Sequence, residues 1–142
     1  MSNIIDLLIR NANSIQKPQT KELEVSRLSA ITGEKFKITV RALTMSEFDS
    51  FPQGENARLH SVIKGIISPS LKDEQLRKAY TPENRKNMLT PKELVQELFT
   101  PGEIANIGSE ILALSGFNEE AIIAAKTIDD IENAEAIEVA KN

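Results

Sequence analysis

The side chains that most readily support catalysis are few in this sequence. His60 is the only histidine, and an imidazole can serve as a general base or as a metal ligand. General-base catalysis also needs a second group that orients the ring. Neither a Ser/His/Asp arrangement nor a second histidine at helical spacing accompanies His60. We therefore expect an ordinary histidine on a helix, at the surface or partly buried.

Two pairs of adjacent acids are the next candidates, as an acid–base dyad or a magnesium site: Glu119-Glu120 and Asp129-Asp130. Acid–base catalysis by two carboxyl groups requires a shaped cleft in which their pKa values differ. Adjacent acids in the first turn of a helix are explained more simply by their favourable interaction with the helix dipole. The sequence therefore favours a structural role for both pairs.

Glycines and basic residues give no stronger indication of chemistry. Gly102 and Gly108 fit neither G-x-x-x-x-G-K-[ST] nor G-x-G-x-x-G, the patterns of phosphate-binding loops. The basic pairs Arg77-Lys78 and Arg85-Lys86 lie in a segment that also contains acids, and we interpret them as part of a solvated face. The sequence thus predicts no catalytic residue, no cofactor and no metal ion, and indicates that the protein is not an enzyme.

Composition and charge narrow the function further. The 142 residues contain no cysteine, which removes disulfides, thiolate nucleophiles and cysteine-type metal sites. Segment 127–142 has five acids and one base and carries the whole net charge of −4, so residues 1–126 are neutral. A neutral body is a poor match for nucleic acid or an anionic membrane surface. The sequence shows neither a signal peptide nor an apolar run of ~18 residues. We therefore expect a soluble, cytoplasmic protein that binds neither nucleic acid nor membranes.

The elements that position these side chains begin with an apolar helix. We predict it over residues 2–13, with Ser2 as the N-cap. Its large aliphatic side chains spread over more than half of its circumference: Ile4, Ile5, Leu7, Leu8 and Ile9. Such a helix must cover its apolar surface, and we expect it to dock on the hairpin that follows, or otherwise to contact a second copy or a partner.

A change of period after the linker at residues 16–20 predicts a β-hairpin over residues 21–43. Apolar and polar side chains alternate there, as in strands, and Gly33 provides a turn residue between them. A two-stranded ribbon is only marginally stable in water. The apolar face formed by Phe36, Ile38 and Val40 must therefore be covered by helices.

Short helices with N-terminal capping patterns follow over residues 44–126. Thr44/Glu47, Thr90/Glu93 and Thr100/Glu103 have the spacing of a capping box, and a proline follows the threonine in the last two. We expect helices to begin near residues 45, 82, 91 and 101, and others to cover 55–67 and 71–80. Gly116 should end the helix at 102–115, and Asn118 should cap a last helix to about residue 126.

The acidic segment 127–142 has aliphatic residues at a constant spacing of three. An α-helix turns about 100° per residue, so these residues drift around the helix and form no single face. We predict a partly ordered tail that folds on a partner.

Three segments carry a family resemblance when they are read in order: FKITVRALTMSEFDSF (36–51), VIKGIISPSLKDEQLRKAY (62–80) and TPKELVQELFTPGEIANIGSEILALSGF (90–117). Together with the opening NIIDLL and the acidic final stretch, they resemble the XkdN-like tail assembly chaperones of long-tailed phages and prophages of Gram-positive bacteria. The stretch 81–89 is longer than this family pattern leads us to expect.

The resemblance implies a non-enzymatic chaperone that acts in the cytoplasm of the bacterial host and is absent from the mature virion. It implies the tape measure protein as the partner, with the tail tube protein as a second candidate. No catalytic residues carry over from the family. Two alternatives stay open: a structural or completion protein of the phage tail, and a small DNA-binding regulator.

The fold expected from these observations is mainly α with a small N-terminal β-hairpin, in which several short capped helices pack on a two-stranded ribbon. One globular domain is predicted over residues 1–126, followed by the tail 127–142. The sequence leaves the oligomeric state open. Partner contacts are expected at aliphatic residues near both ends of the sequence: Ile4, Ile5, Leu8, Ile128 and Ile131.

Overall fold

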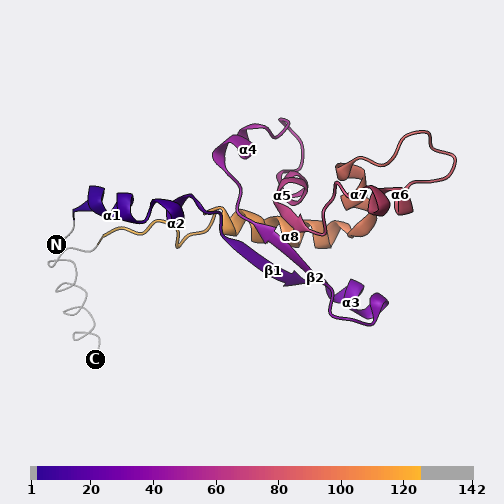
Figure 1. Cartoon of the computed structure of the whole chain (residues 1–142), viewed down its shortest axis with the longest axis horizontal. Helices are drawn as coiled ribbons and strands as arrows, with labels where there is room; N and C mark the ends of the chain where they lie inside the picture. Colours follow the sequence, from indigo (N-terminus) through magenta and orange to yellow (C-terminus); the bar gives the residue numbers. More distant parts are fainter. Residues whose placement is uncertain (1–2, 126–142) are drawn as a thin grey trace, which may run out of the picture.

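A small antiparallel sheet with helices on one face forms the body of the protein (Figure 1). The computed structural model describes residues 3–125. The strands are β1 (Thr20–Glu24), β2 (Lys37–Arg41) and β3 (Ile66–Ser68), in the order β1-β2-β3. Leu23 of β1 lies opposite Ile38 of β2. The α+β fold class is confirmed.

The third strand corrects the prediction of a two-stranded ribbon. The helix expected over 55–67 is α5 (Ala57–Gly65), and the backbone becomes extended at Ile66. Ile66 is buried opposite Val40 and pairs with β2. Ile66 and Ile67 continue the apolar spacing of the helix, so periodicity alone did not reveal the change. Pairing with β2 extends the chain here, and Pro69 disfavours helical geometry for Ser68.

The connection between β1 and β2 also differs from the tight turn that was expected. The two strands pair as predicted, but α3 (Ser26–Thr32) lies between them. Gly33 has the expected positive φ, 79°, and uses it as the left-handed C-cap of α3. A helix satisfies the backbone hydrogen bonds of this longer connection internally.

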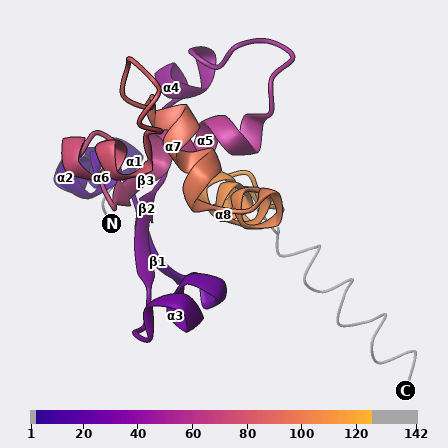
Figure 2. The ribbon, with the colours of Figure 1, turned by 90° about the vertical axis from the view of Figure 1, so that its right-hand side faces the viewer.

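The core lies between the sheet and the two helices α5 and α8 (Pro101–Leu114), with α7 (Pro91–Leu98) beside them (Figure 2). Ile38 and Val40 of the sheet are completely buried, as the alternating pattern required. Helices α5 and α8 approach closely because both carry a glycine at the contact. A Cβ atom at Gly108 would lie 2.6 Å from the carbonyl oxygen of Arg58.

The three predicted capping boxes are confirmed at the starts of α4 (Met45–Asp49), α7 and α8. The helix expected near residue 82 is absent from the described chain, where α6 (Glu74–Tyr80) is followed by turns. Thr81 cannot act as its N-cap, because its hydroxyl accepts from the Leu89 N–H at 3.0 Å and donates to the Arg77 carbonyl at 2.7 Å.

Residues 3–19, which we call the first arm, contain two helices in place of the single helix predicted over 2–13. They are α1 (Ile4–Arg10) and α2 (Ala12–Gln16). Asn3 is the N-cap, accepting from the Asp6 N–H at 2.8 Å, whereas the expected cap, Ser2, lies outside the described residues. The Asn11 side chain donates to the Leu7 carbonyl at 2.8 Å and thereby competes with continuation of the helix.

Residues 117–125, which we call the second arm, return along the side of the body from which the first arm leaves (Figure 1). The helix expected from Asn118 does not form within this range. The Asn118 side chain instead donates to the Ala113 carbonyl and accepts from the Glu120 N–H, both at 3.0 Å, which bends the chain locally. The predicted tail 127–142 lies outside the described residues.

Candidate protein-interaction surface

His60 lies on α5 and is partly buried. Its Nε2 atom pairs with the carboxylate of Glu55, and its ring centroid lies 5.5 Å from that of Phe51. Hydrogen bonds from His60 and then Lys92 lower the pKa of Glu55. The imidazole therefore ties the loop before α5 to the helix, which is a structural contact of the kind expected.

The acid pairs show no arrangement for binding metal. Glu119 and Glu120 lie in the second arm rather than in the first turn of a helix, so the helix-dipole interpretation is wrong for this pair. Asp129 and Asp130 lie outside the described residues. Within residues 3–125, no three His, Asp or Glu side chains are grouped closely enough to hold a metal ion.

Each capping glutamate also binds an arginine from another part of the chain. Arg41 donates to both carboxylate oxygens of Glu47, at 2.9 and 2.7 Å, and lowers the pKa of Glu47 to about 2. Arg27 holds Glu103 in the same two-pronged way, with both distances 3.0 Å, and lowers its pKa. These charges are used within the fold and do not form a reactive centre.

The third such pair changes the interpretation of the basic segment. Arg85 forms a two-pronged contact with Glu93, and this contact lowers the Glu93 pKa to about 2. Arg77 donates to the Leu89 carbonyl at 2.7 Å. Both arginines are therefore partly structural, whereas Lys78 and Lys86 are exposed. The prediction of a solvated face holds for the lysines only.

The first arm presents an uncovered aliphatic surface. Ile4, Ile5 and Leu8 are 72%, 59% and 51% exposed, and α1 and α2 contain no buried residue. The expectation that this helix docks on the hairpin is wrong. The physical reason is that α5 and α8 already cover the apolar face of the sheet on which the first arm was expected to pack.

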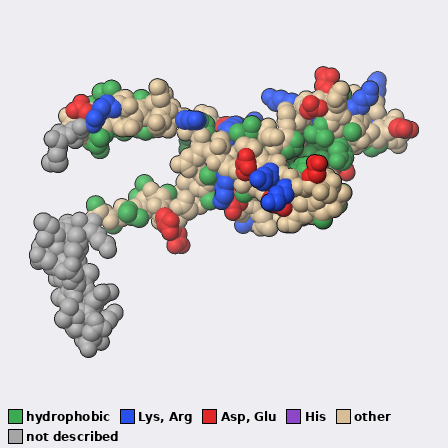
Figure 3. All heavy atoms as spheres, turned by 60° about the horizontal axis from the view of Figure 1, so that its bottom comes forward, with side chains coloured by type: hydrophobic (Ala, Val, Ile, Leu, Met, Phe, Trp, Pro, Cys, Tyr) green, Lys and Arg blue, Asp and Glu red, His purple; other side chains and the backbone are tan. Residues whose placement is uncertain are grey.

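Aliphatic residues of the second arm are exposed as well, and sequence analysis did not select them. Ile122 and Ile123 are 87% and 78% exposed. They fall within the last helix that was predicted to about residue 126. At the base of the arm, the ring centroid of Phe117 lies 4.9 Å from that of Phe48 in α4. This aromatic contact anchors the base of the arm to the body. Figure 3 shows both arms projecting from one side of the body with open space between them.

A hollow of about 410 Å³ lies where the two arms join the body. Ile15 and Pro18 line it from the first arm, and Leu43 and Leu114 line it from the body. The Leu43 N–H donates to the Ser115 hydroxyl at 2.9 Å, which fixes the end of α8 against the strand exit. The hollow thus connects the two exposed arms through a partly apolar floor.

Of the residues predicted to bind a partner, the structure places Ile4, Ile5 and Leu8 together on α1. Ile128 and Ile131 lie outside the described residues. The signal for the second arm was available in the sequence, because Ile122 and Ile123 are adjacent and large, but sequence analysis placed them in a helix and did not consider their exposure.

These features define an α+β protein that exposes aliphatic side chains on two arms. The chain belongs to the family of XkdN-like phage tail assembly chaperones, since residues 53–135, more than half of its length, match the family described as "Phage XkdN-like tail assembly chaperone protein, TAC". The family points to a non-enzymatic role during assembly of the tail in the host. Searches of curated proteins and of solved structures returned no match.

No helix within residues 3–125 is both long enough and apolar enough to span a bilayer.

Proposed function

We propose that this protein binds the tape measure protein while long tails are assembled, and that Ile4, Ile5 and Leu8 of α1 are the primary contact. The chaperone acts in the host cytoplasm and is released before the virion is mature. Ile128 and Ile131 supply further aliphatic contacts. The tail tube protein is the second partner, since its polymerisation around the tape measure protein would displace the chaperone.

The single observation that carries this proposal is the exposure of the first arm. Apolar side chains on α1 cover more than half of the helix, and every one of them faces solvent. Burying one large aliphatic side chain contributes about 1.5–3 kcal/mol. A surface of this kind therefore favours a partner that can cover it on more than one side, as happens when a helix enters a groove.

The second arm supports the same proposal from the other side of the hollow. Ile122 and Ile123 offer a second aliphatic surface, and Glu119 and Glu120 keep that surface solvated while it is unoccupied. A long helical partner with apolar seams fits between two such arms, because each arm can cover one seam. Binding at both arms also adds the two contacts within one complex, which raises the overall affinity.

Co-expression and co-purification with a tape measure protein of a long-tailed phage test the proposal. The variant Ile5→Gln/Leu8→Gln removes two exposed aliphatic groups and keeps residues that favour helix formation. We expect the yield of soluble complex to fall at least tenfold, since each lost contact costs about 1.5 kcal/mol or more. Circular dichroism should show an unchanged fold, because neither side chain is buried.

The matched control is Ile31→Gln/Met45→Gln, which removes two apolar side chains of α3 and α4 that are even more exposed than Ile5 and Leu8. This variant should retain the complex. Equal loss in both double variants would mean that general hydrophobicity, and not the first arm, holds the partner. Mass spectrometry of purified virions addresses the release step: the chain present in stoichiometric amounts would identify a structural or completion protein instead.

A further inference from the structure

A hollow of about 510 Å³, which we call the β3 hollow, lies between α4, the end of α5 and strand β3 with the loop after it. Ile63 and Ile67 supply apolar lining, and Ile67 is 46% exposed although it is a large aliphatic residue. Lys64 and Lys72 line the same hollow and are exposed. Neither lysine forms an ion pair with any residue of the range 3–125.

The charge of this lining is positive after every acid is counted. Three bases and one acid line the β3 hollow, a net charge of +2. The acid is Glu47, and both of its carboxylate oxygens accept hydrogen bonds from Arg41, at 2.9 and 2.7 Å. These two opposite charges neutralise each other, so the charge that remains for a ligand is that of Lys64 and Lys72. An acidic ligand with an aliphatic part matches this lining.

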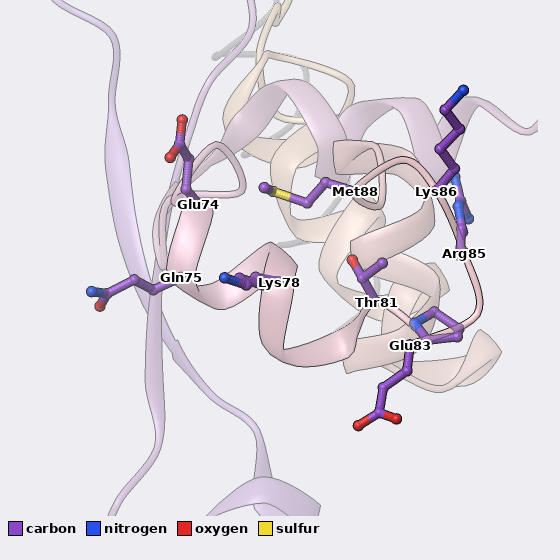
Figure 4. A pocket seen from close by; sticks show the side chains of 9 residues that line it. Glu74, Gln75, Lys78, Thr81, Glu83, Arg85, Lys86 and Met88 are labelled. Atoms are coloured by element: carbon purple, nitrogen blue, oxygen red, sulfur yellow. The ribbon is translucent and has the colours of Figure 1, made fainter.

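A larger hollow, of about 570 Å³ between α6 and the loop that follows it, lacks this property. Lys78 and Lys86 line it together with Glu74 and Glu83, so these charges balance. Arg85 is held by a glutamate of α7, and the Lys86 side chain points away from the hollow (Figure 4). Two lysines are thus present at each hollow, but only those of the β3 hollow leave a net charge.

We propose that the β3 hollow binds the last part of the acidic segment 127–142 of the same chain. That segment has five acids and one base, a net charge of −4. In its last part, Glu135 and Glu138 flank Ile137. The two carboxylates pair with the two lysines of the hollow, and Ile137 contacts Ile67.

The base of the second arm lies close to this hollow. The ring centroid of Phe117 is 4.9 Å from that of Phe48, which follows the lining residue Glu47 in α4. The eight residues 118–125 then lead away from the body (Figure 1). The next eight, 126–133, are as many as the return requires, so the residues after them arrive at the hollow.

This inference does not rest on the proposed function, because its test uses the protein alone. Ile128 and Ile131, which the proposed function uses, belong to the returning residues. Docking of the last part of the segment therefore keeps these two isoleucines beside the body until a partner binds them.

Paramagnetic relaxation in NMR spectra of the full chain tests the inference. The chain contains no cysteine, so Asn142→Cys gives one attachment point for a nitroxide. In about 50 mM salt we expect the amide signals of Ser70 and Lys72 to lose most of their intensity, and those of α3, at the other end of β2, to keep theirs. In about 1 M salt the signals should recover, because charge pairs are screened within about 3 Å.

Charge reversals identify the groups that bind. Lys64→Glu/Lys72→Glu and Glu135→Lys/Glu138→Lys should each reduce the docked population about tenfold, since like charges then face each other. One chain that carries all four changes should dock again.

Two matched controls carry the same changes of charge at other positions. Lys78→Glu/Lys86→Glu alters the larger hollow, and Asp129→Lys/Asp130→Lys alters the returning residues. Both should dock as the unchanged protein does. An equal loss of docking in these controls would mean general charge attraction and would overturn the inference.

A mixture of two preparations separates the same chain from a second copy. Protein with ¹⁵N and no nitroxide is mixed with unlabelled protein that carries the nitroxide, and its signals should stay unchanged. Signal loss in the mixture would make a second copy the occupant. That result, no signal loss in low salt, or an unaffected Lys64→Glu/Lys72→Glu variant would each overturn the inference.

Discussion

Three glutamates in this protein combine two tasks that are usually separate. Glu47, Glu93 and Glu103 each accept a hydrogen bond from the backbone N–H of an N-cap threonine. Each also binds an arginine, and Arg27 is 76 residues away from Glu103 in the sequence. The same carboxylate thus completes a local cap and joins distant parts of the chain.

This double role predicts a loss of stability in acid. Arg41 lowers the pKa of Glu47 to about 2, and Arg85 lowers that of Glu93 to about 2, from an ordinary value of 4.5. A carboxyl group whose pKa is lower in the folded state stabilises the fold above pH 4.5, and this contribution disappears as pH falls toward 2. The melting temperature should therefore be nearly constant from pH 7 to 5 and fall progressively below pH 4.5.

Two variants check the cause of that fall. Arg41→Gln should reduce the melting temperature at pH 7 and flatten its decline in acid, because Glu47 loses the charge that lowers its pKa. Lys37→Gln removes an exposed ion pair with Glu22, in which nitrogen and oxygen are 3.9 Å apart. This variant should change neither the melting temperature at pH 7 nor its decline in acid, since exposed ion pairs contribute little in water. Identical acid profiles for Arg41→Gln and the unchanged protein would contradict the explanation.

The threonine–glutamate caps were predictable from the sequence, whereas their arginine partners were not. A capping box involves residues three positions apart, so its chemistry is visible in the sequence itself. The arginine contacts depend on the fold, because they join β2 to α4 and α3 to α8. The basic residues Arg77 and Arg85 were misjudged for this reason: their partners, Leu89 and Glu93, become neighbours only after folding.

At the scale of elements, the contact between α5 and α8 depends on Gly108. An added Cβ atom there would lie within 2.8 Å of three atoms of Arg58, two of which belong to the backbone. Gly108→Ala should therefore push the helices apart and destabilise the protein by about 1–3 kcal/mol, the usual cost of overpacking. Thermal unfolding measures the change directly.

Gly102 provides the matched control, because it lies on the same helix with nothing within 4 Å of an added Cβ atom. Gly102→Ala should be neutral or stabilise by up to about 1 kcal/mol, since alanine loses less backbone entropy than glycine. Equal melting temperatures for the Gly108→Ala and Gly102→Ala variants would show that the helix crossing tolerates a methyl group.

Element types were predicted well where the local signal was strong and poorly where tertiary contacts decided the outcome. The starts of α4, α7 and α8 are specified by their caps, and the buried face of β2 by its alternation. Strand β3 escaped prediction because pairing with β2, and not its composition, makes Ile66 extended. The first arm was correctly expected to contain an apolar helix, but helical periodicity says nothing about what covers that helix.

At the scale of the whole molecule, the structure predicts a steep gradient of local stability. Strand β2 and helices α5 and α8 contain completely buried side chains, whereas α1 and α2 contain no buried residue. Regions with few buried apolar contacts open at low free energy. Amide hydrogen exchange should be slowest in β2, α5 and α8, and fastest in α1, α2 and residues 117–125.

Helix α7 serves as the comparison within the same measurement. It has 8 residues, close to the 7 of α1, but Leu94 and Val95 are completely buried in it. Its amides should exchange much more slowly than those of α1. Comparable protection of α1 and α7 in the isolated protein would mean that the first arm packs on something in solution, against the exposure described above.

The order of synthesis gives the burial of β2 under α8 a further consequence. Strand β2 ends at Arg41, and α8 ends at Leu114. At about 5–20 residues per second, the ribosome needs about 4–15 s to add the intervening residues. Ile38 and Val40 therefore emerge in the nascent chain well before the helix that covers them, so the central strand waits several seconds for its apolar cover during each round of translation.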